Sequence, residues 1–294
     1  MKRKMDWFEA ILFSAILIYV LSIIFVLYFG FLTSIKHDLD FTGDKNIFGF
    51  PSAKWGWHFS NYLAVFDKCK VPIILNDRTK YIYIEQMFLN SLVYSIITTV
   101  FAIASQLVVA YAVAKYDFKL KKVYYNLAII VMLIPIVGSL PSQMRFAEVL
   151  GLKNSFLGIA IMNCKYPGMY FLVFYAMFKN ISWSYAEAAQ IDGAGHFKIF
   201  IEVMLPLTMS SLVAVFILQF IGHWNEYYTP MLFAPNKVTI AYGLYRFSNT
   251  TTDSSIDQPT ILAACMLSCL PIIALFIMFR NKIMGKVNIG GMKG

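Results

Sequence analysis

The side chains that could perform chemistry are few in this sequence, and they lie far apart. Its histidines stand at no metal-ligand spacing, and they are His37, His58, His196 and His223. The cysteines show no zinc spacing either, and they are Cys69, Cys164, Cys265 and Cys269. Cys265 and Cys269 share one face of an apolar run, where helix packing explains them better than a metal does. No paired acids, Ser–Lys pair or H-E-x-x-H motif falls within the apolar runs. We therefore predict no catalytic residue, no metal site and no cofactor bound by this chain.

The composition indicates a membrane protein. The 294 residues are 59% hydrophobic and only 14% charged, whereas a soluble domain carries about 25% charged residues. A globular core could not bury so much apolar surface, but a bilayer can surround it. The net charge of +9 collects beside the apolar runs rather than along a soluble face. We therefore expect a multi-pass protein of the cell membrane with no nucleic-acid partner.

Six nearly charge-free runs predict an all-α integral membrane protein with six transmembrane helices. They are residues 10–35, 86–114, 123–144, 154–178, 203–225 and 258–279. Each reaches the length of about 20 residues that a helix needs to cross a bilayer. The run after MKRK is too long for a signal peptide and no small-x-small cleavage site follows it, so it is interpreted as the first span.

Basic residues predict the orientation. On the side predicted to be cytoplasmic, they crowd the ends of the apolar runs, at KYDFKLKK and FRNK. On the opposite side, most of them lie in the long segment 36–85, where acidic residues offset their charge. This pattern favours both termini in the cytoplasm. The predicted parts are a cytoplasmic N-terminus (1–9), an extracytoplasmic loop (36–85) and a core (86–294) that ends in a cytoplasmic tail (280–294).

One polar segment, SYAEAAQIDGAGHFKIFIEVMLP (184–206), separates the fourth and fifth runs. Ser184 and Glu187 have the spacing of a capping box, which predicts a helix from Tyr185. Three alanines favour this helix and would leave one surface nearly flat, and they are Ala186, Ala188 and Ala189. Gly193 is placed to end the helix in a left-handed conformation, and Gly195 loosens the turn.

The second half of the segment predicts another short helix, from about His196 to Met204. Its expected apolar face consists of Phe197, Phe200, Ile201 and Met204, and Pro206 would open the next span at its first turn. A hairpin lying on lipid head groups would be rich in Lys and Arg, but this one has Lys198 against three acids. We therefore interpret it as a cytoplasmic docking element for another protein.

The segment resembles the EAA loop of bacterial ABC importer permeases. That loop has Glu-Ala-Ala, a glycine four residues after the second alanine, and aliphatic-x-Leu-Pro ten residues later. The matching residues are Glu187, Ala188, Ala189, Gly193, Val203, Leu205 and Pro206, with Val203 where isoleucine is commoner. The resemblance implies that this loop, with Asp192, Ala194 and Gly195, is a coupling helix seated in a groove of a separate ATPase.

Further stretches resemble the carbohydrate branch of this family, and in particular the smaller permease of the maltose-type importer. They are FLNSLVYSIITTVFAIASQLVVAYAVAKYDFK, PSQMRFAEVLGLKNSFLGIAI, HWNEYYTPMLF with its W-N-x-x-x-x-P pattern, and GKVNIGGMKG. The resemblance covers most of the chain from residue 86 and is weaker at 34–85, where an insertion precedes the second span. It implies a permease that forms a sugar or oligosaccharide path with a second, similar permease by alternating access.

The implied partners are two ATPase subunits, which would hold ATP and magnesium, and an extracytoplasmic solute-binding protein. The chain has no G-x-x-x-x-G-K-[ST] loop, so it is not the ATPase and we expect no enzyme activity. A peptide or polyamine permease would share the EAA loop but should lack the W-N-x-x-x-x-P and glycine-rich tail resemblances. An ion-coupled carrier would need acids near mid-membrane, where only Glu226 approaches a span.

Polar side chains within the runs are candidates for the solute path, because facing lipid would cost them several kcal/mol. They are Asn163, Lys165, Tyr166, Gln219, His223, Trp224, Asn225 and Glu226. Trp224 with Asn225 offers the aromatic face and the amide that sugars require. Trp224 could instead join Tyr227 and Tyr228 in an interfacial aromatic belt, and Lys165 could pair with Glu226 or with an acid on the partner permease.

The long loop before the second run contains PSAKWGWHFSNYLAVF. Ser60 could cap a short amphipathic helix that lies on the outer membrane face through Tyr62, Leu63, Val65 and Phe66.

Overall fold

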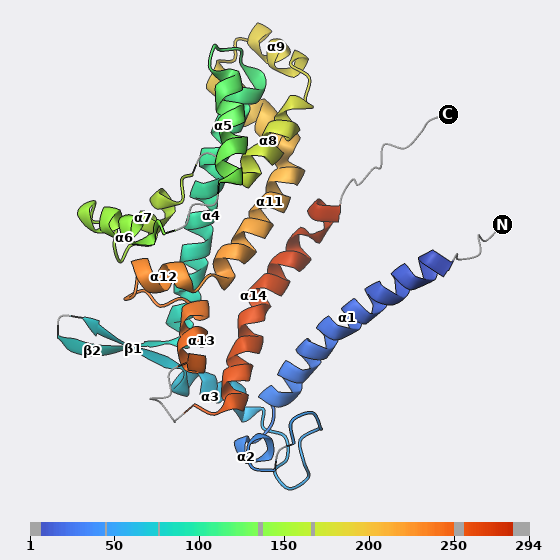
Figure 1. The fold of residues 1–294 in the computed structure, drawn as a ribbon, viewed down its shortest axis with the longest axis vertical. Helices are drawn as coiled ribbons and strands as arrows, with labels where there is room; N and C mark the ends of the chain where they lie inside the picture. The colour runs from blue at the N-terminus through green and yellow to red at the C-terminus, as the bar shows by residue number, and fades with distance from the viewer. Residues whose placement is uncertain are drawn as a thin grey trace. The chain divides into compact units, whose positions relative to one another are not determined.

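The computed structural model describes residues 7–44, 46–75, 77–134, 138–165, 168–249 and 256–284, and most of them are helical (Figure 1). The helices are α1 (Trp7–Ser34), α2 (Asp38–Phe41), α3 (Ser60–Lys68), α4 (Ile84–Lys115), α5 (Lys121–Leu133), α6 (Leu140–Val149), α7 (Phe156–Met162), α8 (Met169–Lys179), α9 (Ser184–Ile191), α10 (His196–Lys198), the π-helix η1 (Ile199–Met204), α11 (Leu205–Asn225), α12 (Tyr228–Phe233), α13 (Ile240–Asn249) and α14 (Gln258–Met284). The chain forms two compact units, one of residues 1–72, 81–85 and 243–270, and one of the remaining residues.

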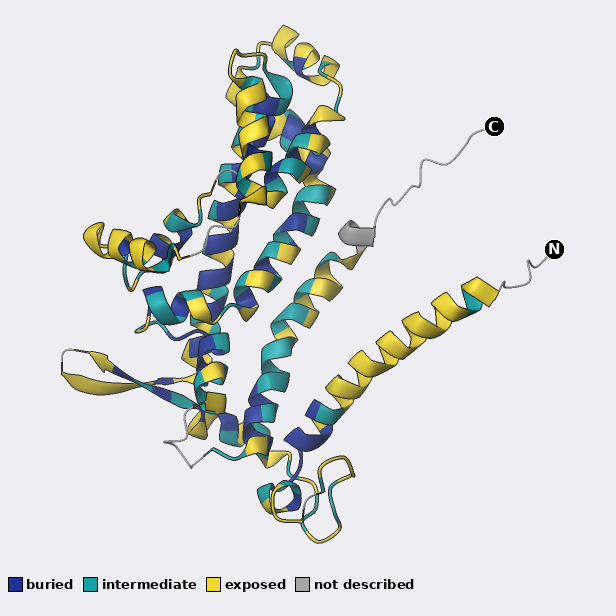
Figure 2. Cartoon of the chain, viewed as in Figure 1, coloured by how far each residue is buried: buried dark blue, intermediate teal, exposed yellow. Residues whose placement is uncertain are grey.

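Four helical stretches are long and apolar enough to cross a membrane. They are Trp7–Ser34, Ile84–Lys115, His196–Asn225 and Gln258–Arg280. The first, second, fifth and sixth predicted runs therefore lie in continuous helices. Figure 2 shows α1 exposed along almost its whole length, with burial only near its C-terminal end. A helix that is apolar on every side is suited to lipid.

The third and fourth predicted runs are not continuous helices. The run at 123–144 contains most of α5 and the start of α6, and the run at 154–178 contains α7 and most of α8. Each run contains prolines, at 135 and 141 in the first and at 167 in the second. Proline lacks an N–H donor and its ring clashes with the preceding turn, so it disfavours a helix that would continue through it. Pro141 lies in the first turn of α6, where proline is tolerated. Figure 1 shows α6 and α7 away from α5 and α8.

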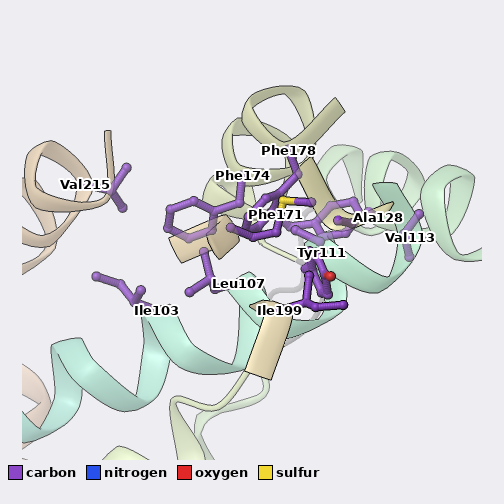
Figure 3. Packing of buried hydrophobic residues seen from close by; sticks show 13 residues of the cluster. Ile103, Leu107, Tyr111, Val113, Ala128, Phe171, Phe174, Phe178, Ile199 and Val215 are labelled. Atoms are coloured by element: carbon purple, nitrogen blue, oxygen red, sulfur yellow. The ribbon is translucent and has the colours of Figure 1, made fainter. Parts of the chain in front are cut away.

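The core of the second unit joins α4, α5, α8, η1 and α11. Phe171, Phe174 and Phe178 lie on one face of α8 at helical spacing, and all three are fully buried. Figure 3 shows them against Ile103, Leu107 and Tyr111 of α4, with Ile199 and Val215 nearby. Ala186 of α9 belongs to the same cluster. This core therefore fixes the polar segment 184–206 to the helices on either side of it.

Pro206 lies in the first turn of α11, as predicted, and α11 follows the π-helix η1 without a break within the helical stretch His196–Asn225. Proline at position 206 cannot donate to the carbonyl of Glu202, four residues earlier. The wider π-turn directly before it accommodates the missing bond and the ring. The predicted second short helix therefore runs directly into the fifth span.

Two further expectations from the sequence are wrong outside the spans. The prediction of an all-α fold missed a two-stranded sheet of β1 (Lys70–Leu75) and β2 (Arg78–Tyr83). Asp77 in the connecting turn has φ 58°, a left-handed conformation that aspartate tolerates. The amphipathic helix exists as α3, but Phe59 rather than Ser60 is its N-cap and no side chain caps it. Of its expected membrane face only Leu63 and Phe66 are exposed, because Val65 is fully buried and the Tyr62 hydroxyl lies 2.8 Å from that of Ser34.

Candidate functional site

The polar segment 184–206 forms a helix–elbow–helix. Gly193 has φ +80°, which confirms the predicted left-handed residue. The N–H of Gly193 donates to the carbonyl of Gln190 and that of Ala194 to the carbonyl of Ala189, both at 2.9 Å. These two bonds form a Schellman motif, which satisfies the last carbonyls of α9 and reverses the chain. Gly195 is extended (φ −73°, ψ 160°) and precedes α10.

The predicted capping box is absent from the start of α9. The N-cap residue is Trp183, whose carbonyl accepts the N–H groups of Ala186 and Glu187. The hydroxyl of Ser184 is 2.7 Å from the hydroxyl of Ser182 instead. The helix therefore begins one residue earlier than predicted, and Glu187 remains exposed.

The alanines of α9 do not form one flat outer face, which corrects the prediction. Ala186 is fully buried, and Ala189 and Ala194 pack against the same core. Ala188 is exposed. Small side chains on the inner side let α9 approach the core closely, while the outer side is free for another surface.

Large apolar side chains are exposed on both sides of the elbow. Ile191 at the end of α9 is 87% exposed and Phe197 of α10 is 75% exposed. Ile201 is also exposed, whereas Met204 is buried and Phe200 packs on Tyr111 with ring centroids 4.7 Å apart. The expected single face of Phe197, Phe200, Ile201 and Met204 is therefore divided between an outer and an inner side.

The end of α4 contacts the chain on both sides of α9. Lys115 donates from Nζ to the carbonyl of Ile181, before α9. The hydroxyl of Tyr116 lies 3.0 Å from Nδ1 of His196, after the elbow. The Tyr116 ring also makes an edge contact with Trp183, with centroids 5.8 Å apart. Sequence reasoning missed Lys115 and Tyr116, because only the folded chain brings them to the elbow.

The structure brings Asn163 and Lys165 together in a pocket of about 240 Å³. Its lining is both polar and apolar, and it consists of Ser139, Leu140, Gln143, Ile159, Met162, Asn163, Lys165, Tyr228, Thr229 and Phe233. Hydroxyl, amide and ammonium groups in this lining can hydrogen-bond several hydroxyls of a bound molecule. Sequence reasoning missed Ser139, Gln143 and Thr229, because each is a common polar residue at a helix end.

The other path candidates of the fifth span lie outside this pocket. Trp224 is 2% exposed and packs between Phe88 and Phe220, with ring centroids 6.1 and 5.9 Å away. This side chain is part of the protein core. Neither of the two interpretations from the sequence, a solute contact or an interfacial belt, describes that position. Asn225 is exposed, and Gln219 is half-buried.

His223 and Glu226 also have defined surroundings. His223 makes an edge contact with Tyr94, with centroids 6.0 Å apart. Glu226 accepts the N–H groups of Tyr228 and Thr229 through Oε1, and so caps α12. Among the residues with described positions, no ion pair joins Lys165 to Glu226. Tyr166 lies outside the described residues.

Comparison with known proteins identifies the family. Residues 106–282 match the model for the binding-protein-dependent transport system inner membrane component. This chain belongs to that family. It is a multi-pass protein of the cytoplasmic membrane and a permease subunit of an ABC importer, and such subunits are not enzymes.

Several curated relatives are permeases of similar length. The chain is 29% identical over 238 residues to the arabinooligosaccharides transport system permease protein of Halalkalibacterium halodurans, covering 78% of this chain and 82% of the relative. It is 28% identical over 211 residues to the trehalose transport system permease protein of Mycobacterium tuberculosis, covering 70% and 76%. It is 28% identical over 204 residues to the sn-glycerol-3-phosphate transport system permease protein of Yersinia pestis, covering 69% and 72%.

A solved structure shows the same fold. It is a chain of a bacterial ABC transporter involved in the import of the acidic polysaccharide alginate, with a TM-score of 0.73 and 21% sequence identity. The match covers 96% of this chain and 98% of the other.

Proposed function

We propose that this permease forms, with a second similar permease, the membrane path of an ATP-driven importer for a sugar or oligosaccharide. The names of the arabinooligosaccharides and trehalose relatives support this substrate class. The proposed partners are two cytoplasmic ATPase subunits, which hold the ATP and magnesium, and an extracytoplasmic solute-binding protein. Transport proceeds by alternating access, driven by ATP binding and hydrolysis on the partner chains.

The elbow at Gly193 carries the proposal. It is a rigid reversal of the chain, held by two backbone hydrogen bonds, with the exposed apolar side chains of Ile191 and Phe197 on either side. Exposed apolar side chains at the tip of a polar segment favour contact with another protein. The residues proposed for ATPase coupling are Glu187, Ala188, Ala189, Asp192, Gly193, Ala194, Gly195, Leu205 and Pro206. Since Ala189 faces inward, it acts by seating α9 rather than by touching the ATPase.

Coupling follows from differential binding. An ATPase dimer that grips the elbow more tightly in one arrangement of the permeases shifts the equilibrium toward that arrangement. Moving a two-state equilibrium from 1:99 to 99:1 requires about 5.5 kcal/mol of differential affinity. Two elbows, one on each permease, would share this free energy.

The proposed topology places both termini and the elbow in the cytoplasm, with six crossings of the membrane. Four crossings are the continuous helical stretches, and α5 and α8 belong to the third and fourth. Residues 1–9 and 280–294 are the cytoplasmic ends, residues 36–85 form an extracytoplasmic loop, and residues 86–294 form the permease core.

The pocket of Asn163 and Lys165 is the proposed contact with solute. Gln143, Ser139 and Thr229 provide further hydrogen-bonding groups on its lining. A volume of about 240 Å³ is below the range of about 300–1,000 Å³ typical of ligand pockets. It would therefore hold one part of a sugar, with the partner permease completing the site.

Uptake by cells that lack this permease tests the function. We expect deletion to abolish accumulation of one labelled sugar from a panel of arabinooligosaccharides and trehalose, with sn-glycerol-3-phosphate as the non-sugar comparison, and the wild-type chain to restore it. Depletion of ATP at a maintained proton gradient should stop this uptake. Uptake that survives ATP depletion but stops with an uncoupler would instead identify an ion-coupled carrier, and restored uptake of a peptide or polyamine would reject the sugar assignment.

A further inference from the structure

The segment between α1 and α3 is folded around buried polar side chains. Lys36 has no exposed surface, and its Nζ donates to the carbonyls of Asn46 and Ile47 at 2.7 and 3.0 Å. Asp40 is also fully buried, and its carboxylate accepts the amide of Asn46 at 3.2 Å and the N–H of Ser52 at 3.0 Å. Buried charges with several hydrogen bonds each hold a loop in one conformation.

This scaffold presents two phenylalanines on a tight turn. Asn46 donates from Nδ2 to the carbonyl of Phe50 at 2.7 Å and accepts the N–H of Gly49 through Oδ1 at 3.1 Å. Phe48 and Phe50 lie within this turn, and both remain exposed (66% and 62%). Their exposure is therefore set by the shape of the turn and is not the result of a loose loop.

Both phenylalanines contact the last turns of α1. The ring of Phe48 lies 5.6 Å from that of Phe29 and 6.2 Å from that of Phe25, and the ring of Phe50 lies 6.4 Å from that of Tyr28. The turn of residues 46–50 therefore folds back along the helix toward the membrane.

The length of α1 sets the depth of this contact. Its 28 residues span about 42 Å at 1.5 Å per residue, and the hydrocarbon layer is about 30 Å thick. A centred helix would extend about 6 Å beyond the hydrocarbon at each end. Phe29 then lies at the edge of the hydrocarbon, and Phe25, one turn earlier, lies inside it. Phe48, which touches both, is at the boundary between head groups and acyl chains.

The exposed aromatic surface continues from Phe50 to α3. The ring of Trp57 lies 6.5 Å from that of Phe50, and it stacks on Phe59 at 6.3 Å with an interplanar angle of 9°. Phe59, Leu63 and Phe66 follow at spacings of four and three residues, which places them on one face of α3. All three are exposed.

The polar contacts of the same segment lie around a different tryptophan. Trp55 stacks on His37 with ring centroids 4.7 Å apart and donates from Nε1 to Asp44 at 2.7 Å. Asp44 also pairs with Lys54 at 3.4 Å. The segment is thus amphipathic, with Trp57 among apolar side chains and Trp55 among polar ones.

We propose that Phe48, Phe50, Trp57, Phe59, Leu63 and Phe66 form an interfacial anchor that inserts into the lipid boundary around the C-terminal end of α1. Aromatic side chains are enriched at this level of a bilayer, and an amphipathic segment gains free energy by burying its apolar face there. The continuity of the patch with the lipid-facing surface of α1 favours lipid over a protein partner. The anchor fixes the depth of α1, whose apolar surface alone permits sliding and tilting.

Quenching of tryptophan fluorescence by bromine-labelled lipid tests the anchor. The full chain, with any subunits that copurify, is placed in bilayers with or without phosphatidylcholine brominated high on its acyl chains. Subtracting the emission of the Trp57→Phe variant from that of the wild type gives the emission of Trp57. The Trp55→Phe variant gives the emission of Trp55 in the same way and is the matched control on the polar side. We expect brominated lipid to remove most of the Trp57 emission and little of the Trp55 emission.

Two results would overturn the proposal. If brominated lipid does not quench the Trp57 emission but iodide does, the patch lies in water. Trp57 emission that resists both quenchers would place the patch under another protein chain. The test requires no transport activity, so its failure leaves the proposed importer function standing.

Discussion

The hydroxyl of Tyr116 lies 3.0 Å from Nδ1 of His196, although 80 residues separate them in the chain. Tyr116 directly follows α4, and His196 begins the helical stretch that continues as the fifth span. The neighbouring Lys115 binds the carbonyl of Ile181 before α9. Any displacement of the elbow therefore acts on α4 from both sides, which makes the end of α4 a connection between the elbow and the second span.

Tyr116→Phe should weaken coupling between ATP hydrolysis and uptake. The variant keeps the ring contact with Trp183 and loses only the hydrogen bond to His196, which is worth about 0.5–1.5 kcal/mol. We expect the assembled transporter to keep its ATP hydrolysis while solute moved per ATP falls by about 2- to 10-fold. The measurement is uptake and hydrolysis in the same proteoliposomes.

A double-mutant cycle with His196→Ala assigns this effect to the pair. If the two side chains act through their shared bond, the double variant should be no worse than the poorer single variant. Fully additive losses would show that each residue acts by itself.

Gly193→Ala should impair docking of the ATPase more than Gly195→Ala does. A β-carbon would meet no atom within 4 Å at either position, so the two variants differ in backbone conformation and not in space. Gly193 is left-handed, which costs alanine about 1–2 kcal/mol, whereas Gly195 has a conformation open to any residue. The measurement is the amount of ATPase that copurifies with each variant. Equal retention by both would contradict the importance of the Gly193 conformation.

The four continuous spans and the elbow were predictable because their signals are local. A long apolar run predicts a membrane-spanning helix whatever the helix packs against. A glycine after a helix-favouring run of alanines predicts a left-handed residue that ends the helix, and Gly193 is such a residue. The hairpin of β1 and β2 was missed although its signal is also local. KVPIIL and RTKYIY are rich in β-branched and aromatic residues, and the sequence Asn-Asp lies between them.

The features that the sequence did not predict depend on packing between segments that are distant in the chain. Ala186 and Ala188 are identical in sequence, and only the position of the core makes one buried and the other exposed. Trp224 was weighed as a solute contact or a belt residue, because its neighbours Phe88 and Phe220 cannot be located from spacing alone. Tyr116 and Lys115 carried no motif, and their role follows from the position of the elbow beside α4.

Gln106 and Gly168 should show strongly non-additive effects on stability. The Gln106 carboxamide accepts the N–H of Phe171 at 3.0 Å and donates to the carbonyl of Ala102 at 3.2 Å, so it ties α4 to the start of α8. A β-carbon at position 168 would lie 2.6 Å from Oε1 of Gln106. Gly168→Ala should therefore cost about 1–3 kcal/mol by overpacking.

Gln106→Ala removes the atom with which that β-carbon would clash. The double variant Gln106→Ala/Gly168→Ala should thus be less destabilised than the sum of the single variants. Thermal unfolding in detergent measures all three. Additive losses would show that the clash is relieved elsewhere.

Asp257 should make the first unit sensitive to acid. Its carboxylate accepts the N–H of Thr260 at 2.8 Å, which caps α14, and pairs with Lys68 of α3 at 3.0 Å. Partial burial raises the pKa of Asp257, but the hydrogen bonds from Thr260 and Lys68 outweigh it and hold the pKa below its usual value. The unfolded chain therefore binds this proton more readily than the folded chain, so stability from Asp257 is present above about pH 4 and is lost as the pH falls through the folded-state pKa.

Asp257→Asn separates the cap from the charge. Asparagine can still accept the N–H of Thr260, so the variant should lose only the ion pair, which at this partly exposed site is worth about 0.2–1 kcal/mol. We expect a slightly lower Tm at pH 7 and a smaller fall in Tm between about pH 5 and pH 3 than in the wild type. Asp67→Asn removes the same charge from an exposed position on α3 and serves as the control, with the wild-type acid response. Identical acid responses of Asp257→Asn and the wild type would show that other carboxylates govern the acid stability of this unit.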